Sequence, residues 1–473
     1  MPDGYDVLLR DGGIAHVRPA PPADREGLHE LVVFLVGDHA YKLKKPDNFA
    51  TLHARQEACR REVELNRRLA PDVYEGVASV LGPDGTVCEY LVVMRRMPEE
   101  RRLATLVRAG KPVEEHVRAV ARQLAELHTK ARRGSQIDQE CGIRSRWTAA
   151  VERVRGIAGA TIEPAMLDEI ERLVLRFLDG RSSLFEARTA EGRIVEGHGD
   201  LVAEDIFCLD DGPRILSCLD YDERLRFLDG LDDSAFLAMD LEWLGAPRLA
   251  DLFLRWYVEF SGDQAPTALW HHYVAYRAFV RAENACVRHS QGDVDAAWEA
   301  RRLAELALRH LHAATVTLVL VGGPVASGKT TLARALADRL GFTLLRSSDV
   351  PPESEVYAEL VSRAERLLGQ GESVVLDASW ADEQYRAMAT QAADRTSSNR
   401  VSLLCTVMPQ LAATRLATRE TPSSAPAMSP WPDAIEIDTG IPLEQALMRA
   451  LSAVHPPELN MRWRFQRPQM EPD

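Results

Sequence analysis

The hydrophobic pattern of the N-terminal part predicts a small antiparallel sheet with one helix. Two apolar runs, LVVFLV and HAYKLK, occupy residues 31–45 and are joined by Gly37-Asp38, a sequence typical of a β-hairpin turn. Residues 51–69 are rich in Ala, Glu, Arg and Leu and end before Pro71, which favours a helix. Two further apolar runs, GVASVL and CEYLVVM, flank a turn at residues 83–85. These runs predict a sheet that carries one helix.

After about Arg101 the pattern changes to a helical period. Apolar residues recur there at spacings of four, three, four and three, at Val113, Val117, Val120, Leu124 and Leu127. The exception is the segment 194–222, where the runs IFCL and RILSCL bracket the turn residues 210–213. The sequence therefore predicts a mostly helical region that contains one hairpin.

A third pattern begins near Ala313. A helix is expected at 297–312, and it is followed by the apolar run VTLVLV, a glycine-containing loop and another helix. Two later apolar runs, SVVLDA and VSLLCTV, alternate with helical segments near 354–369 and 382–394. This alternation is typical of a parallel α/β sheet, so we expect a domain boundary near Ala313.

Composition narrows the class of protein. The length of 473 residues suggests two or three domains at about 150 residues each. Asp and Glu exceed Lys and Arg by 71 to 57, which disfavours nucleic acid or anionic lipid as the main partner. The seven cysteines are scattered without a CxxC pair, and no signal peptide or long apolar run is evident. We therefore expect a cytoplasmic protein with reduced thiols and without a membrane partner.

The strongest chemical signal is the string GPVASGKT at Gly323–Thr330, between a buried strand and the helix TLARALADRL. It fits the pattern of a loop that wraps phosphate oxygens with backbone N–H groups at a helix N-terminus. Lys329 would supply charge to the outer phosphates, and the Thr330 hydroxyl would bind Mg²⁺. The candidate nucleotide-binding residues are Gly323, Ser327, Gly328, Lys329, Thr330 and Thr331. Asp377, which ends the strand SVVLD, either holds Mg²⁺ or caps the strand.

A second signal is the string HGDLVAED at residues 198–205, followed after the hairpin by CLDYD. It brings Asp200, Asp205 and Asp220 close to one another. Such crowding of carboxylates is unfavourable unless cations neutralise it, and Mg²⁺ with a nucleotide is the simplest neutraliser. The alternative is a solvated acidic loop.

Residues 31 to about 290 resemble the aminoglycoside-phosphotransferase family of kinase-like enzymes, which carry HGDxxxxN followed by an Ile-Asp pair. HAYKLKKP resembles the family's ATP-binding strand, and REVELNRRLAPDVY its charged helix. The resemblance implies a bilobal protein-kinase-like fold.

Carried over residue by residue, the resemblance implies that Asp200 is the catalytic base and Asp220 the Mg²⁺ ligand. Lys44 becomes the phosphate-pairing lysine and Glu62 its acidic partner. Lys42 lies on the same strand face, so the period of the strand does not choose between the two lysines. Asp205 stands where the family has a metal-binding asparagine, which adds a negative charge to the site.

Residues 315 to about 420 resemble the small P-loop kinases of the zeta-toxin and gluconate-kinase type, on the loop, the SSD string, VVLDA and an arginine pair. The resemblance implies that Asp349 contacts the acceptor hydroxyl and that Arg415 and Arg419 belong to a lid. Only VPPES separates Asp349 from the next helix, which is shorter than in the family. The acceptor site would then be reduced, leaving hydrolysis or binding alone.

The whole arrangement resembles bifunctional aminoglycoside phosphotransferase/ATP-binding proteins. We expect an extension at 1–30, a kinase-like domain at 31–312 and a P-loop kinase-like α/β domain at 313–473. The expected function is transfer of the γ-phosphate of ATP, with Mg²⁺, to a hydroxyl of a sugar, amino sugar or aminoglycoside-like metabolite. The alternative is a regulatory protein that binds ATP without transfer. Four residues near 271–281 either line an acceptor pocket or are ordinary helix-surface groups: His271, His272, Arg277 and Arg281.

Overall fold

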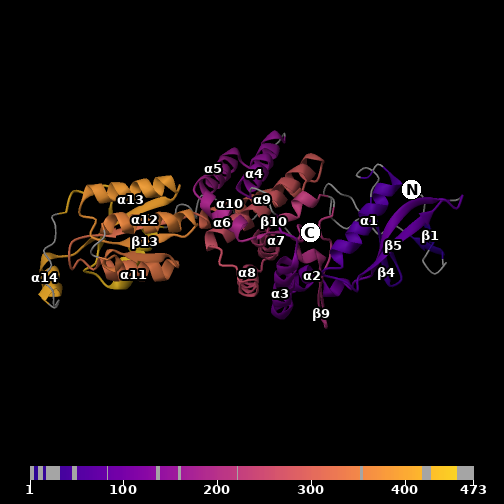
Figure 1. Ribbon diagram of the computed structural model, residues 1–473, viewed down its shortest axis with the longest axis horizontal. Helices are drawn as coiled ribbons and strands as arrows, with labels where there is room; N and C mark the ends of the chain where they lie inside the picture. The colour runs from indigo at the N-terminus through magenta and orange to yellow at the C-terminus, as the bar shows by residue number, and fades with distance from the viewer. Residues whose placement is uncertain are drawn as a thin grey trace, which may run out of the picture. The chain divides into compact units, whose positions relative to one another are not determined.

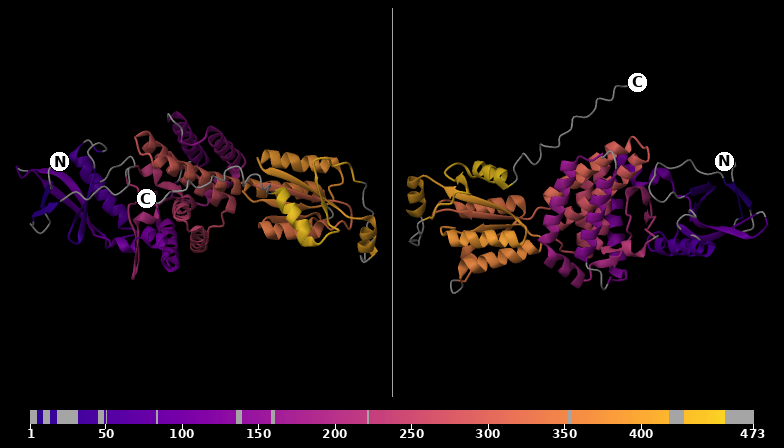
Figure 2. Two further views of the ribbon diagram at one scale, coloured as in Figure 1. Left: turned by 180° about the vertical axis from the view of Figure 1, so that it is seen from behind. Right: turned by 90° about the horizontal axis from the view of Figure 1, so that it is seen from above.

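The computed structural model describes residues 5–8, 14–17, 32–44, 49, 51–82, 84–134, 139–157, 161–220, 222–351, 355–417 and 428–454 (Figures 1 and 2). Its contacts divide the chain into two compact units. We call the first the N-terminal unit; it comprises Met1–Leu167, Arg188–Ala265 and Tyr273–Ala307. We call the second the P-loop unit; it comprises Asp168–Ala187, Pro266–His272 and Leu308–Asp473. None of the helices in the described ranges is both long and apolar enough to span a bilayer.

The N-terminal unit begins with an antiparallel sheet of order β3-β4-β6-β5. Its strands are β3 (Val32–Val36), β4 (His39–Leu43), β5 (Tyr74–Leu81) and β6 (Val87–Arg95). Helix α1 (Leu52–Asn66) packs on the sheet, and the Thr51 side chain caps it by accepting a hydrogen bond from the Ala54 N–H at 3.1 Å. The apolar side chains Cys59, Val63 and Val92 fill the space between the helix and the sheet. A separate hairpin joins β1 (Tyr5–Leu8) and β2 (Ile14–Val17).

The rest of the N-terminal unit is mostly helical. The predicted stripe of α3 is buried at Val117, Val120 and Leu124, and this helix packs against α8. The α-helices between β6 and β11 are α2 (Leu103–Arg108), α3 (Glu114–Lys130), α4 (Gln139–Gly156), α5 (Pro164–Asp179), α6 (Ser182–Ala190), α7 (Gly230–Trp243), α8 (Pro247–Ser261), α9 (Thr267–Ser290) and α10 (Ala296–Ala313). Most of α5 and α6, the start of α9 and the end of α10 belong to the P-loop unit. The short strands β8 (Ile206–Leu209) and β9 (Gly212–Ile215) form the predicted hairpin, and β7 (Ile194–Glu196) pairs with β10 (Phe227–Asp229).

The P-loop unit is a five-stranded parallel sheet with helices on both faces (Figure 1). Its strands are β11 (Thr317–Gly322), β12 (Thr343–Arg346), β13 (Val374–Asp377), β14 (Asn399–Thr406) and β15 (Ile435–Asp438). Their order in the sheet is β12-β13-β11-β14-β15. Helices α12 (Val356–Gly369) and α13 (Glu383–Arg395) cover one face, and α11 (Lys329–Leu340) and α15 (Leu443–Val454) cover the other. A short helix, α14 (Pro409–Ala417), follows β14. Every residue of β11 and β13 is buried, as the continuous apolar runs predicted.

A segment from the middle of the chain is part of the P-loop unit. The link between α5 and α6 lies against the loop 396–398, which leads into β14. The Arg181 guanidinium is buried there and donates to the carbonyl oxygens of Thr396 at 2.5 Å and Gly180 at 2.7 Å. Burial, together with the nearby Arg176, lowers the pKa of Arg181 to about 9. The P-loop fold is therefore completed by residues that precede it by more than 100 positions in the chain.

We predict that Gly180→Ala destabilises the P-loop unit. An ideal Cβ at Gly180 would lie 2.1 Å from the Thr396 carbonyl oxygen and 2.7 Å from its carbon. Backbone must move to make room, so we expect a loss of about 1–3 kcal/mol in the free energy of unfolding, measured by guanidinium denaturation of the full chain. Gly76→Ala is the control, because nothing lies within 4 Å of its ideal Cβ. Equal denaturation midpoints for the two variants would contradict the packing described here.

Candidate active sites

A buried carboxylate between two lysines marks the first candidate site. Helix α1 carries Glu62, and its Oε1 lies 2.6 Å from the Lys42 Nζ while its Oε2 lies 2.7 Å from the Lys44 Nζ. Burial alone would raise the pKa of Glu62, but the two ammonium groups outweigh burial and hold the pKa at about 2. Lys44 also forms an ion pair with Asp220, whereas Lys42 contacts Glu62. Lys44 is thus the lysine that links helix α1 to the downstream acidic segment.

The backbone brings the three predicted acidic positions into adjoining segments. The Leu219 N–H donates a hydrogen bond to the His198 carbonyl at 3.0 Å. Asp220, the next residue after Leu219, is therefore held near the start of the HGD string. The Leu216 N–H donates to the Asp205 carbonyl at 2.9 Å. Asp200 is three residues from Ala203 and forms part of the same loop. The structure therefore places Asp200 and Asp205 before the β8–β9 hairpin and Asp220 in the segment that follows it.

The same helix that carries Glu62 also holds the segment before Asp220. One turn after Glu62, the Asn66 side-chain oxygen accepts from the Cys218 N–H at 2.8 Å. Ser217 has a left-handed φ of 63°, unusual for a residue other than glycine, and its N–H donates to the Tyr74 hydroxyl at 3.1 Å. These two bonds fix the strained backbone that delivers Asp220 to Lys44.

Asp233 on α7, which no sequence motif indicated, holds the HGD loop through its backbone. Its carboxylate accepts from the N–H of His198 at 2.6 Å and of Gly199 at 2.8 Å, and it lies 2.9 Å from the His128 Nε2. Burial would raise the pKa of Asp233, but hydrogen bonding and attraction by His128 hold it below the ordinary value. An ideal Cβ at Gly197 would lie 2.3 Å from this carboxylate, which explains the glycine before His198.

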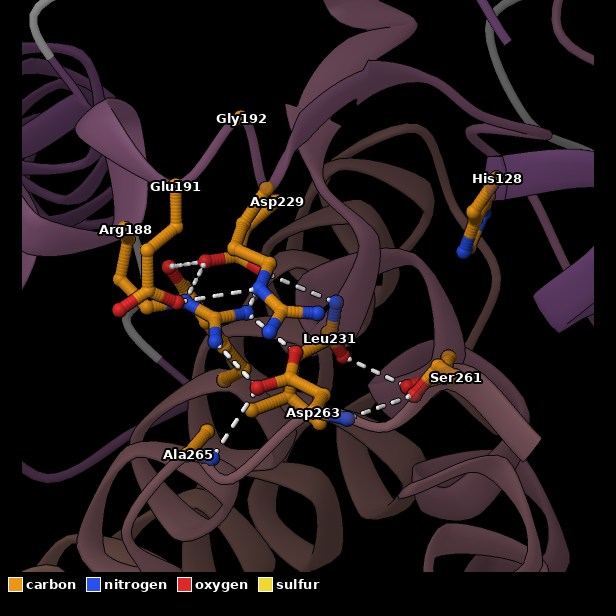
Figure 3. A network of polar contacts seen from close by, with 12 residues as sticks. His128, Arg188, Glu191, Gly192, Asp229, Leu231, Ser261, Asp263 and Ala265 are labelled. Carbon is orange, nitrogen blue, oxygen red and sulfur yellow. Dashed lines mark hydrogen bonds and ion pairs between the residues drawn. The ribbon is translucent and has the colours of Figure 1, made fainter. Parts of the chain in front are cut away.

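A buried clamp fixes the start of α7 and thereby Asp233 (Figure 3). The Asp229 carboxylate caps the helix by accepting from the Leu231 N–H at 2.9 Å. Arg188 binds Asp229 through Nε at 2.8 Å and Nη2 at 2.5 Å, and it binds Asp263 through Nη1 at 2.5 Å and Nη2 at 2.7 Å. Although burial lowers the pKa of Arg188, the two carboxylates outweigh it and raise the pKa above its ordinary value. Three segments of the unit are therefore joined at one guanidinium.

The second candidate site is the glycine loop between β11 and α11. Three of its residues have left-handed φ values, Gly323 at 138°, Ala326 at 64° and Gly328 at 83°. The Gly323 N–H donates to the Ser379 carbonyl at 3.1 Å, and α11 begins at Lys329. The loop therefore has the folded-back backbone and helix N-terminus expected of an anion-binding loop, with Thr330 and Thr331 in the first helical turn.

Two buried oxygens at this loop have no hydrogen-bond partner within the described residues: Ser327 Oγ and Asp377 Oδ1. Burial raises the pKa of Asp377 above its ordinary value, although a hydrogen bond with Thr330 and the charge of Lys329 act in the opposite direction. Orphaned oxygens beside a helix N-terminus suit a phosphate group with its Mg²⁺, so the residues present fit this group. Within the described part of the chain, no group of three or more His, Cys, Asp or Glu side chains is placed so that it could hold a metal ion.

The other predicted residues of this unit have different surroundings. Arg415 lies at the loop, where its Nη2 donates to the Thr439 carbonyl at 2.9 Å. Asp349 is held by two hydrogen bonds of 2.9 Å from Arg346, a residue that no sequence motif indicated. Arg346, the last residue of β12, is paired in the sheet register with Asp377, the last residue of β13. Both residues therefore lie at the ends of their strands. Arg419 lies outside the described residues.

The four candidate acceptor residues near 271–281 do not form one group. His271 and His272 belong to the P-loop unit, while Arg277 and Arg281 belong to the N-terminal unit. Arg277 is buried and its Nε lies 2.7 Å from Asp232, so it is not a surface group. Arg281 forms an ion pair with Asp240.

Comparisons with known proteins found a family model and several solved structures that align with parts of this chain. A family model described as an AAA domain matches residues 318–430. A sugar kinase from Janibacter sp. HTCC2649 aligns with 31% of this chain and 98% of its own at 22% identity and a TM-score of 0.24. The GDP and kanamycin complex of APH(2")-IIia aligns with 63% of this chain and 95% of its own at 17% identity and a TM-score of 0.41.

The AAA match lies in the parallel α/β unit, and the N-terminal unit has the predicted sheet with one helix followed by a helical lobe. The predicted fusion of a kinase-like fold with a P-loop kinase-like fold is therefore confirmed. A curated relative, the uncharacterized protein Rv2004c of Mycobacterium tuberculosis, is 40% identical over 476 residues, which cover 92% of this chain and 96% of the relative. At this identity over almost the full length of both, the chain belongs to the family of the mycobacterial protein Rv2004c.

Proposed function

We propose that the chain is an ATP-dependent phosphotransferase whose N-terminal unit moves the γ-phosphate of ATP to a hydroxyl of a small metabolite. The observation that carries this proposal is the ion-paired position of Lys44 between Glu62 and Asp220. An ammonium group that is buried, held in place by a carboxylate and adjacent to a second carboxylate is suited to bind a phosphate that arrives with a divalent cation.

The residues around Lys44 have separate tasks in this proposal. Glu62 keeps the ammonium of Lys44 aimed at the phosphates. Asp220 and Asp205 supply the carboxylate oxygens that Mg²⁺ prefers, and Mg²⁺ neutralises phosphate charge when it is bound. Asp200 orients the acceptor hydroxyl and accepts its proton.

Asp233 keeps Asp200 in place without touching the substrate. It binds the N–H groups of His198 and Gly199, the two residues that precede Asp200. The Nε2 of His198 in turn lies 2.9 Å from the Leu216 carbonyl, and its Nδ1 accepts from the Asp200 N–H at 3.3 Å. Because each bond restricts the loop backbone, the carboxylate of Asp200 is presented in one orientation.

For the P-loop unit we propose ATP binding through the loop residues Gly323–Thr331, Asp377 and the lid arginines, without phosphoryl transfer to an acceptor. The observation that favours binding alone is the two-bond contact between Arg346 and Asp349. Asp349 is the residue expected to contact an acceptor hydroxyl, and a guanidinium already occupies both of its oxygens. The carboxylate is therefore engaged in a charge-assisted pair instead of facing an acceptor.

Substitutions of the two lysines should separate their roles. We expect Lys44→Met to lower phosphoryl transfer about 100-fold or more, because an ion-paired ammonium contributes about 3 kcal/mol to phosphate binding. Lys42→Met should retain most of the activity, since Lys44 alone also contacts Asp220. The measurement is transfer from γ-labelled ATP with Mg²⁺ to a panel of sugars, amino sugars and aminoglycosides.

Asp200→Asn is the test of the catalytic assignment in the same assay. It should abolish transfer while ATP still binds, because the amide keeps the shape of the carboxylate but takes up no proton. Transfer at the wild-type rate by Asp200→Asn would refute the proposed reaction in the N-terminal unit.

The two nucleotide sites should be separable by calorimetry. We expect the wild-type chain to bind two ATP molecules. The Lys329→Ala variant should bind only one with the wild-type affinity, because the affinity of the glycine loop for ATP should fall about 100-fold or more. Lys44→Met should remove the other site. The control is Lys111→Ala, because Lys111 is exposed in the loop before α3. Two ATP molecules bound by Lys329→Ala would contradict the assignment of the glycine loop.

A further inference from the structure

We propose that a pocket beside the HGD loop binds a small organic anion, a carboxylate or phosphate group on an apolar body, and that this ligand regulates the loop through Arg68. The pocket lies between the end of α1, the C-terminal half of α3 and β7, all in the N-terminal unit. Its described lining includes none of the residues assigned above to ATP, Mg²⁺ or the acceptor. The binding site stands by itself, and its regulatory role rests on the proposed function.

The pocket has the size and the lining of a small-molecule site. Its volume is about 520 Å³. Sites for small molecules typically have volumes of about 300–1,000 Å³ and are lined by apolar side chains with a few polar groups. Leu69, Pro71, Leu127 and Ala131 supply the apolar part of the wall, and most of the other lining side chains are charged. A ligand with an apolar body and one charged group fits this lining.

Arg68 is the cation of the lining that no carboxylate neutralises. Its Nε donates to the Leu65 carbonyl at 2.9 Å, and its Nη1 donates to the Glu196 carbonyl at 3.4 Å. Its Nη2 donates to the Gly197 carbonyl at 3.2 Å and lies 3.3 Å from the Cys218 Sγ. Within the described residues these acceptors are uncharged and occupy four of the five N–H groups of a guanidinium. The positive charge and one donor are left for an anion.

The carboxylate that β7 contributes to the wall is already shared by two other guanidinium groups. The Glu196 Oε2 lies 2.9 Å from the Arg132 Nε, and the Glu196 Oε1 lies 3.0 Å from the Arg226 Nη2. Arg132 also forms an ion pair with Glu223. Glu196 therefore meets Arg68 only through its backbone carbonyl and does not neutralise it.

The charges at the pocket add up to a positive excess. Lys130 and Glu126 form the remaining pair, with the Nζ 3.7 Å from the Oε2. With Arg68 included, the described charged residues of the lining and their ion-pair partners are four cations and three carboxylates. One positive charge is thus in excess, in a chain whose formal net charge is −14. Such an excess favours an anionic ligand.

Arg68 connects the pocket to the segments that carry the proposed catalytic residues. Glu196 and Gly197, whose carbonyls accept from Arg68, directly precede the HGD string. A carboxylate or phosphate attracts a guanidinium more strongly than a neutral carbonyl does. A bound anion should therefore draw Arg68 away from these carbonyls and loosen the backbone that leads to Asp200.

The binding test uses fluorine NMR with three probes that share one ring and differ in the head group: 4-fluorobenzoate, 4-fluorophenyl phosphate and 4-fluorobenzyl alcohol. An excess of a non-hydrolysable ATP analogue with Mg²⁺ fills the nucleotide sites. We expect saturable broadening of the fluorine line of at least one anion, with an affinity at least tenfold higher than that of the alcohol. The anion that binds shows whether the head group is a carboxylate or a phosphate. Binding of neither anion, or equal binding of the alcohol, would overturn the inference.

Variants of the full chain locate the bound anion. Arg68→Met removes the unmatched charge, and Ala131→Phe fills the pocket while every charge stays in place. Each should weaken binding of the anion at least tenfold. Arg60→Met is the matched control, because it removes an exposed arginine from α1 that is paired with Glu57, and it should bind the anion as the wild type does. Wild-type affinity in either Arg68→Met or Ala131→Phe would overturn the inference.

Hydrogen exchange measures the effect on the loop without an acceptor. The readout is the exchange rate of the peptide that covers residues 194–205, with and without the anion that binds. We expect at least twofold faster exchange with the anion in the wild type and in Arg60→Met, and no change in Ala131→Phe. Equal exchange with and without the anion in the wild type would overturn the regulatory role.

Failure of this inference and failure of the proposed function give different results. If the anion speeds exchange of the loop but the chain transfers no phosphate, the pocket stands and the proposed function fails. If transfer depends on Asp200 but neither anion binds, the function stands and the pocket is wrong. If both hold, the anion should lower kcat at saturating ATP and acceptor, and Ala131→Phe should be insensitive to it.

Discussion

A carboxylate leaves water at a cost of several kcal/mol unless opposite charges or hydrogen-bond donors meet it, and this requirement decides where the functional segments of the N-terminal unit lie. Glu62 is buried between two ammonium groups, and Asp233 is buried beneath two N–H groups and an imidazole. Asp229 is buried against Arg188. Each buried acid fixes the segment that supplies its partner, so the sheet, the HGD loop and α7 are held in one arrangement.

The sequence predicted the elements whose signals are local. The hairpin at Gly37-Asp38 has a glycine with a φ of 56°, and the apolar stripe of α3 is buried as its spacing indicated. Strands β12 and β15 were not predicted, and both lie at an edge of their sheet. All four residues of β12 are only partly buried, and β15 buries one residue of four, so neither has a strong hydrophobic pattern. The docking of the α5–α6 link onto the loop 396–398 depends on long-range packing, which no local pattern reveals.

The candidate sites show the same difference between residues that a local motif indicates and residues that depend on long-range contacts. Asp200, Asp220 and Lys329 could be named as candidates from the sequence because each lies in a short string whose neighbours are also candidate residues. Asp233 was missed because its partner His128 is 105 positions away. A signal was nevertheless present, since three acids in the apolar stretch DDSAFLAMDLE prove to be buried: Asp232, Asp233 and Asp240. Charged residues at positions that a helix must bury indicate partners elsewhere in the chain.

In the proposed function the two units would hold phosphate by different physical means, and this difference explains why one candidate site was easier to recognise than the other. In the glycine loop, the hydrogen-bond donors are backbone N–H groups. Their geometry is set by the φ values of a few neighbouring residues, so one short sequence motif is enough to predict it. In the N-terminal unit, charge is supplied by Lys44 directly after β4, Glu62 on α1 and Asp220 in the segment after β9, and α7 holds the HGD loop. Such a site exists only when the whole unit is folded, because Lys44, Glu62 and Asp220 are far apart in the chain. In the proposed function its side chains would exchange partners when a ligand binds, because Lys44 would lose the Asp220 carboxylate to Mg²⁺. A backbone loop offers the same amides whether or not a ligand is present.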